Sequence, residues 1–124
     1  MVSAPATVLI VEDDPDLRRL IVRLLEHDGF AVRAAADGRE ALDALEPMPD
    51  VIVADLMMPD LDGEQFLLEL RSRFPEARPA IVLVSASAIR EQVADRLDVD
   101  ASLSKPFDTA ELRDLVRELA TREG

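Results

Sequence analysis

Three short runs of the chain are almost wholly apolar and rich in β-branched residues, and they constrain the fold more than any other feature. Thr7–Val11, Val51–Val53 and Ala80–Val84 each have the composition of a strand that is buried on both faces of a sheet. Such strands belong almost only to parallel sheets that helices cover on both sides. The runs therefore predict an α/β domain with its sheet in the middle.

Amphipathic segments and two weaker strands alternate with these runs. Phe30–Ala34 and Ala101–Ser104 are the weaker strands, and Arg33 suggests that the first of them lies at an edge. The expected helices are a segment from Pro15 that Gly29 ends, Arg39–Leu45, Gly63–Phe74, a short segment marked by Ile89, Val93 and Leu97, and a last helix capped by Thr109. Five strands alternating with five helices indicate a doubly wound parallel sheet.

Length and composition limit the class of protein. The 124 residues are enough for one domain, expected over 1–124 with its core at about 7–120. No apolar run approaches the roughly 20 residues that cross a bilayer, so no membrane role is expected. The chain has no cysteine, which excludes a disulfide framework and favours the cytoplasm. The net charge of −12 disfavours direct nucleic-acid binding and favours cations, above all Mg²⁺, as small partners.

Chemically active side chains follow four of the five strands. Glu12 and Asp13 end the first strand, Asp55 the third and Ser85 the fourth, while Lys105 comes just after the fifth. Parallel strands end along one edge, where open α/β sheets hold their ligands. Three carboxylates there repel one another, and a divalent cation such as Mg²⁺ relieves the repulsion. With a lysine and a hydroxyl donor, they are the groups that phosphoryl transfer to an aspartate requires.

Each of these residues has a plainer explanation. Asp55 could merely start a loop, and Ser85 could satisfy the backbone at a strand end. Lys105 could be a solvated surface lysine, and the acidic residues at 12–14 could favour the start of the following helix. Asp14 or Asp16 could have that role alone. For each residue taken singly, the plainer explanation prevails. For the set it does not, because chemically active residues would have to follow four strands by accident.

The pattern as a whole resembles a response-regulator receiver domain of two-component signalling. The resemblance covers about Thr7 to Leu119. It is carried by VLIVEDD at 8–14, by the D-x-x-M-P-x-x-D-G pattern from Asp55 to Gly63, by Ser85-Ala86 and by Lys105-Pro106-Phe107. Together these motifs are highly specific, although each alone would be weak.

This resemblance implies a flavodoxin-like sheet with strand order 2-1-3-4-5 and a phosphoacceptor role. Asp55 would accept a phosphoryl group from a histidine kinase or a histidine phosphotransfer protein. Mg²⁺ would be bound by Asp13, Asp55 and the backbone carbonyl of Met57, with Glu12 acting through water.

Other residues of the pattern carry implied roles around that chemistry. Ser85 and Lys105 would bind phosphoryl oxygens, and a cis peptide would precede Pro106. Met57 and Ser87 would tune how long the phosphoryl group survives. The domain would catalyse only its own phosphorylation and dephosphorylation. It would switch a downstream protein target or an output domain through the face made by the fourth helix, fifth strand and fifth helix.

The chain departs from the family pattern in three ways. Ser102 stands where an aromatic residue is usual, Asp98-Val99 replaces the usual Gly-Ala, and the segment between Ser85 and Lys105 is about two residues shorter than is common. We therefore expect switching without an aromatic side chain that changes its rotamer.

Two other functions remain as alternatives. One is a Mg²⁺-dependent phosphatase with an aspartyl-phosphate intermediate, since Asp14-Pro15-Asp16 faintly resembles the paired-aspartate motif of haloacid-dehalogenase-like enzymes. The other is a docking module that works without phosphorylation. Val22, expected on the outer side of the first helix beside Arg18 and Arg19, marks a possible partner surface. Whether the domain acts alone or within a longer regulator stays open.

Overall fold

A computed structural model describes residues 5–56, 63–86, 95 and 97–121 of the chain. Within them, five parallel strands form one sheet in the order β2-β1-β3-β4-β5. The strands are β1 (Thr7–Val11), β2 (Ala31–Ala35), β3 (Val51–Asp55), β4 (Ala80–Ser85) and β5 (Ala101–Ser104). The helices are α1 (Pro15–His27), α2 (Gly38–Asp43), α3 (Gly63–Arg73) and α5 (Thr109–Thr121). The predicted order 2-1-3-4-5 is confirmed.

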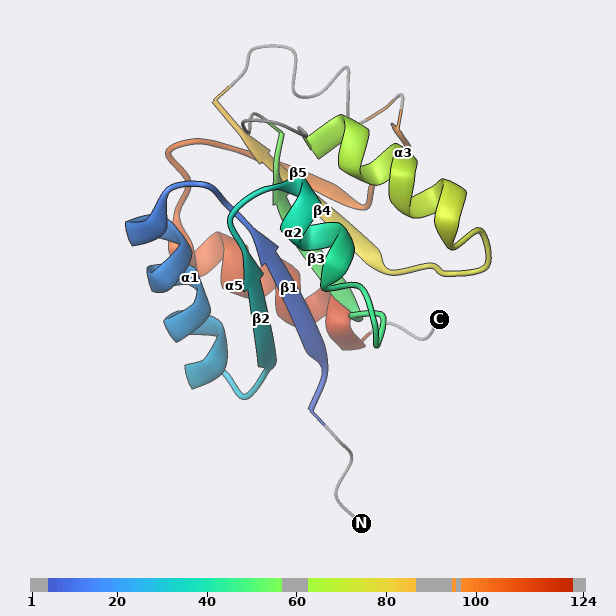
Figure 1. The fold of residues 1–124 in the computed structure, drawn as a ribbon. Coiled ribbons are helices and arrows are strands. Elements are labelled where there is room, and N and C mark those ends of the chain that lie inside the picture. Colours follow the sequence, from blue (N-terminus) through green and yellow to red (C-terminus); the bar gives the residue numbers. More distant parts are fainter. Residues whose placement is uncertain (1–4, 57–62, 87–94, 96, 122–124) are drawn as a thin grey trace.

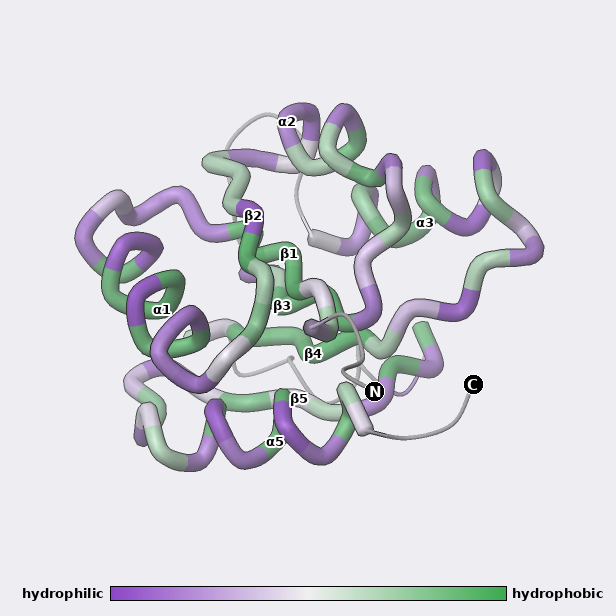
Figure 2. Tube along the Cα trace, turned by 90° about the horizontal axis from the view of Figure 1, so that it is seen from below, coloured by the Kyte–Doolittle hydropathy of each residue, from purple (hydrophilic) through white to green (hydrophobic). Residues whose placement is uncertain are grey.

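Helices cover the sheet on both faces, as Figure 1 shows. α1 and α5 lie on one face, while α2 and α3 lie on the other. In Figure 2 the central strands form an apolar band, and the hydrophilic positions turn outward on the helices. None of the helices in the described ranges combines the length and apolar character that crossing a bilayer requires.

Several boundaries and orientations differ from the sequence predictions. β2 begins and ends one residue later than predicted, at Ala31–Ala35 and not at Phe30–Ala34. Leu20, expected on the inner face of α1, is 45% exposed, whereas Val22, expected outside, is partly buried against the core. α5 is capped by Asp108 and not by Thr109, because the Asp108 carboxylate accepts a hydrogen bond from the Ala110 N–H at 2.8 Å. Of the three residues that marked the helix expected before β5, Ile89 and Val93 lie outside the described residues, while Leu97 is buried in the core.

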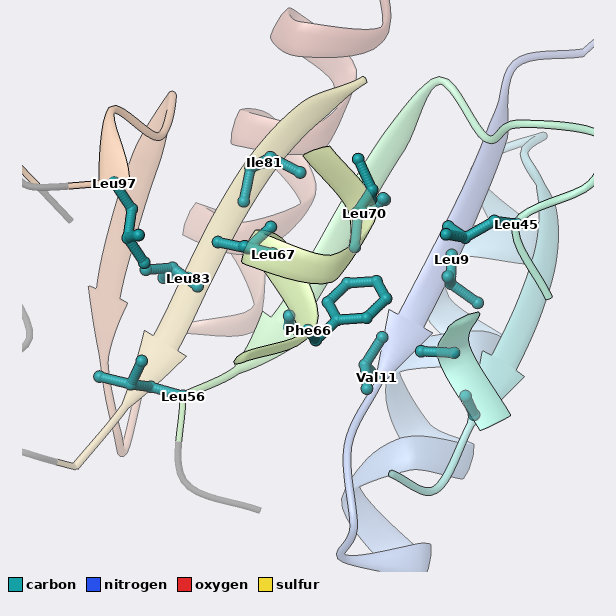
Figure 3. Packing of buried hydrophobic residues seen from close by; sticks show 14 residues of the cluster. Leu9, Val11, Leu45, Leu56, Phe66, Leu67, Leu70, Ile81, Leu83 and Leu97 are labelled. Carbon is teal, nitrogen blue, oxygen red and sulfur yellow. The ribbon is translucent and has the colours of Figure 1, made fainter. Parts of the chain in front are cut away.

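Phe66 is the central side chain of the core between the sheet and α2–α3. It is fully buried, and Figure 3 shows its ring extending from α3 toward Val11 on β1. Leu9 and Leu67 pack in the same cluster. This packing attaches α3 to the centre of the sheet, and α3 begins beside the end of β3.

Replacing Phe66 with alanine should therefore destabilise the domain strongly. We expect a loss of about 3–5 kcal/mol in the free energy of unfolding, because a large ring leaves a cavity that a packed core closes only in part. Urea unfolding followed by far-UV circular dichroism measures the loss. The matched control is Leu68→Ala, at a position that is 52% exposed on the same helix. Equal losses in both variants would contradict this description of the core.

The Asp98-Val99 departure has a structural counterpart. Asp98 has a φ of 55°, in the left-handed region where glycine is comfortable and aspartate is tolerated better than most residues. The Arg71 guanidinium of α3 donates to the carbonyls of Leu97 and Asp98, the latter at 3.2 Å. Arg71 therefore supports the backbone at the position where the resemblance led us to expect glycine.

On the face of the sheet opposite α3, an ion pair joins the end of α1 to α5. The Arg113 guanidinium donates to both carboxylate oxygens of Asp28, at 2.8 and 2.6 Å, and the Asp28 side chain is only 7% exposed. The hydrogen bonds from Arg113 hold the pKa of Asp28 below its ordinary value of 3.8, against the opposing effect of burial.

This pair predicts a specific loss of stability in acid. A carboxylate whose pKa is lower in the folded state stabilises that state fully above its unfolded pKa, here about 3.8. The stabilisation is lost as the pH falls through the depressed folded pKa. We expect Asp28→Asn to be less stable than the wild type at pH 6 and to approach it in acid. Thermal unfolding at several pH values measures this, and a constant difference would contradict it.

Candidate functional site

The strand ends that carry the predicted residues are held together by the backbone. Val11 pairs with Ala54 in the parallel register, so Glu12 and Asp55 follow side by side on adjacent strands. Hydrogen bonds also continue the sheet past its strand ends. They join Glu12 N to Ala35 O at 3.1 Å, Leu56 N to Val84 O at 2.9 Å and Lys105 N to Ser85 O at 3.0 Å. The register thus places the predicted side chains at one edge of the sheet.

Glu12, Asp13 and Asp55 form an acidic group at this edge. Each offers one carboxylate oxygen, and these oxygens lie within 4.8 Å of one another. Glu12 and Asp55 are only 3% and 5% exposed, whereas Asp13 is open to solvent. Mg²⁺ prefers a few carboxylates and keeps several waters, so a half-buried, half-open group of this kind could bind it. The predicted carboxylate ligands are therefore together, while Met57 lies outside the described residues.

Lys105 connects the two buried carboxylates. Its Nζ lies 2.7 Å from Asp55 Oδ2 and 2.8 Å from Glu12 Oε1. It is also the only lysine in the chain. The sequence predicted that Lys105 could reach Asp55, and the structure confirms this and adds Glu12 as a second partner. The ammonium group thus offsets part of the negative charge at the site.

The pKa values of Lys105 and Glu12 reflect this arrangement. Burial raises the pKa of Glu12 above its ordinary 4.5, and the nearby Asp55 carboxylate adds to this. Hydrogen bonds from Lys105 and from the backbone of Asp14 act in the opposite direction. Burial lowers the pKa of Lys105, but hydrogen bonds to Asp55 and Glu12 outweigh it and raise the pKa above 10.5. Lys105 is therefore a stable cation.

Ser85 lies at the same edge. Ser85 is fully buried. It pairs with Ser104 on the neighbouring strand β5, and Lys105 is the residue that follows Ser104. Ser87, the other predicted residue on this side, lies outside the described residues.

Two residues near the start of α1 contact the backbone there, and the sequence predicted the role of only one of them. Asp14 caps α1, since its carboxylate accepts hydrogen bonds from the N–H groups of Asp16 and Leu17. The faint phosphatase motif therefore coincides with a helix cap. Arg18, expected on the outer surface, instead donates to the carbonyl of Glu12 at 2.8 Å. The only sequence feature that pointed to this contact was the position of Arg18 in the first turn of the helix that follows the acidic residues.

Gly63 permits the close approach of α3 to the residue at the centre of the site. A side-chain Cβ at this position would lie 2.6 Å from the carbonyl oxygen of Asp55 and 2.8 Å from the Cα of Leu56. Both are backbone atoms, so a side chain here would displace the end of β3 or the start of α3. The Gly63 N–H also donates to the Leu56 carbonyl at 3.1 Å.

Gly63→Ala should therefore disturb both the fold and the acidic group. We expect a loss of about 1–3 kcal/mol in unfolding free energy, typical of overpacking in a closed site. We also expect shifted amide resonances for Asp55 and Leu56 in NMR spectra. An alanine variant with wild-type stability and unshifted resonances would contradict the close approach.

A shallow groove of about 480 Å³ lies beside the site. Its lining is mostly apolar, with Lys105 on one side. The other lining residues are Asp14, Leu17, Leu20, Ala86, Pro106, Phe107 and Thr109. The exposure of Leu20, which differs from the sequence prediction, is explained by its position in this groove.

The chain was compared with known proteins. A family model described as the response regulator receiver domain matches residues 8–117. Response regulator Rre1 of Synechocystis is 37% identical over 126 residues, covering 98% of this chain and 54% of Rre1. Sensor kinase CckA of Brucella abortus is also 37% identical, covering 98% of this chain and 13% of CckA. The chemotaxis protein CheY4 of Vibrio cholerae has a similar structure, with a TM-score of 0.84, 29% identity and coverage of 94% of this chain and 99% of CheY4.

Proposed function

The chain belongs to the family of response regulator receiver domains, and from this we propose that Asp55 is its phosphoacceptor. The observation that carries the proposal is the position of the Asp55 carboxylate. It is nearly buried at the end of β3, lies 2.7 Å from the only lysine and belongs to the acidic group. A carboxylate in this setting is oriented and next to a cation, as a nucleophile toward phosphorus needs to be.

The proposed reaction is phosphoryl transfer from a phosphohistidine of a partner protein. A carboxylate oxygen of Asp55 attacks phosphorus, the phosphorus–nitrogen bond breaks, and the leaving imidazole takes up a proton. Mg²⁺, when bound, supplies positive charge to the phosphoryl oxygens. Lys105 donates a hydrogen bond to one of these oxygens, and the Ser85 hydroxyl donates to another. Water later attacks the phosphorus, which releases inorganic phosphate and restores Asp55.

Glu12 and Asp13 have different roles in this proposal. Both would hold Mg²⁺ together with Asp55 and the Met57 carbonyl, Glu12 acting through water. The exposed Asp13 gives the ion access to solvent, and the buried Glu12 keeps Lys105 close to the reacting atoms. The residues therefore divide between binding the ion and binding the phosphoryl group.

The partners follow from this chemistry. The phosphodonor would be a histidine kinase or a histidine phosphotransfer protein, with its contact over the groove that includes Leu20 and Lys105. The matched relatives include a response regulator and a sensor kinase, and this chain spans about half the length of the first. The phosphorylated domain would act on a downstream protein or an output domain through α5, β5 and the fourth helix that the sequence predicts before β5. With Ser102 on β5, this step would proceed without an aromatic rotamer change.

The test is phosphorylation by a small acyl phosphate in the presence of Mg²⁺. Intact mass spectrometry should show one added phosphoryl group on the wild type. The adduct should be absent with EDTA and in Asp55→Asn. Asp16→Asn is the matched control, because it makes the same change at a carboxylate that is 89% exposed outside the acidic group. An adduct in Asp55→Asn, or none in the wild type, would refute the assignment, and turnover of a phosphate ester would favour a phosphatase.

A further inference from the structure

Arg18 makes an unusual contact for a residue in the first turns of α1. Its Nη1 donates to the backbone carbonyl of Glu12 at 2.8 Å and lies 3.4 Å from the carbonyl of Asp13. The guanidinium therefore turns back along the helix to the loop that carries two members of the acidic group. The next residue, Arg19, pairs instead with the exposed carboxylate of Asp16, at 2.7 Å.

These contacts restrain the one acidic residue that the core does not hold. The side chain of Glu12 is buried and is fixed by Lys105 and by the Asp14 N–H, which lies 3.1 Å from Glu12 Oε2. Asp13 is exposed, so the direction of its carboxylate depends on the peptide planes on either side of its Cα. The Nη1 group of Arg18 binds the carbonyl of Glu12 closely and that of Asp13 more weakly, and so restrains both of those planes.

We propose that Arg18 is a positioning residue for the metal site, acting through the backbone of Glu12 and Asp13. The inference rests on the proposed Mg²⁺ binding by the acidic group. Residues that orient metal ligands without touching the ion commonly change metal affinity by about 10–100-fold when they are replaced. Arg18 fits that role, because it binds the main chain that carries two of the three carboxylates.

A purely electrostatic role for Arg18 predicts the opposite result. A guanidinium close to a dication repels it, so its removal would tighten Mg²⁺ binding. A positioning role predicts weaker binding, because the Asp13 carboxylate would no longer be held toward the other two. The sign of the change in affinity therefore separates the two roles.

The experiment is a calorimetric titration of Mg²⁺ into the full chain, without a phosphodonor. The variants are Arg18→Ala and Arg19→Ala, which remove the same charge from adjacent positions, and Arg18→Lys, which keeps the charge but ends in an ammonium group that reaches less far than Nη1. We expect Arg18→Ala to bind Mg²⁺ about 10-fold more weakly and Arg19→Ala to bind close to wild type. Arg18→Lys should fall between Arg18→Ala and the wild type.

Metal-free thermal unfolding separates positioning from general damage to the fold. We expect the melting temperatures of Arg18→Ala and Arg19→Ala to be similar, while their Mg²⁺ affinities differ. Unchanged or tighter Mg²⁺ binding in Arg18→Ala, or equal weakening in both alanine variants, would overturn the inference. If Arg18→Ala does not fold, Arg18→Lys decides the matter, and wild-type affinity in that variant would overturn it. A wild type that binds no Mg²⁺ would instead refute the proposed metal site, and the inference with it.

Discussion

The ion pairs of Lys105 with Glu12 and Asp55 are the interactions on which the site depends. The parallel register of β1 and β3 puts two nearly inaccessible carboxylates side by side, where their repulsion opposes folding. A single ammonium within 2.8 Å of both compensates for part of that cost. Because Lys105 follows β5, its position depends on the correct pairing of β5 with β4. The electrostatics of the site and the completion of the sheet are therefore linked.

Arginine side chains hold the connections around this sheet. Arg33 on the edge strand donates to the carbonyls of Ala44 and Pro47, which lie between α2 and β3. Arg71 holds the backbone before β5, and Arg18 holds the turn after β1. Loop and helix-end carbonyls lack partners within regular structure, and a long side chain with several donors can reach them. An acidic chain thus uses several of its arginines to organise loops.

The sequence predicted the sheet well and individual side chains less well. β1 and β3 were predicted from runs that only a buried strand tolerates, and parallel topology then brought Asp55 and Lys105 together. The cap of α5 was misplaced because Asp108 and Thr109 are both good capping residues, and composition does not choose between them. The exposure of Leu20 was not predicted. Helical spacing shows which residues share the apolar face of α1, but it does not show how much of that face the rest of the domain covers.

The contacts of Arg18 and the second contact of Lys105, with Glu12, show where sequence patterns stop being informative. Both side chains are long, so the position of the Cα leaves many directions for the charged group. The two kinds of cation also differ in position, since the arginine contacts in the described part of the chain are with carbonyls and with acids outside the acidic group, while the one lysine occupies the site. An isotope label restricted to lysine side chains would consequently introduce one signal, from the ammonium beside Asp55. The chain thus contains its own spectroscopic reporter of the site, without any engineered probe.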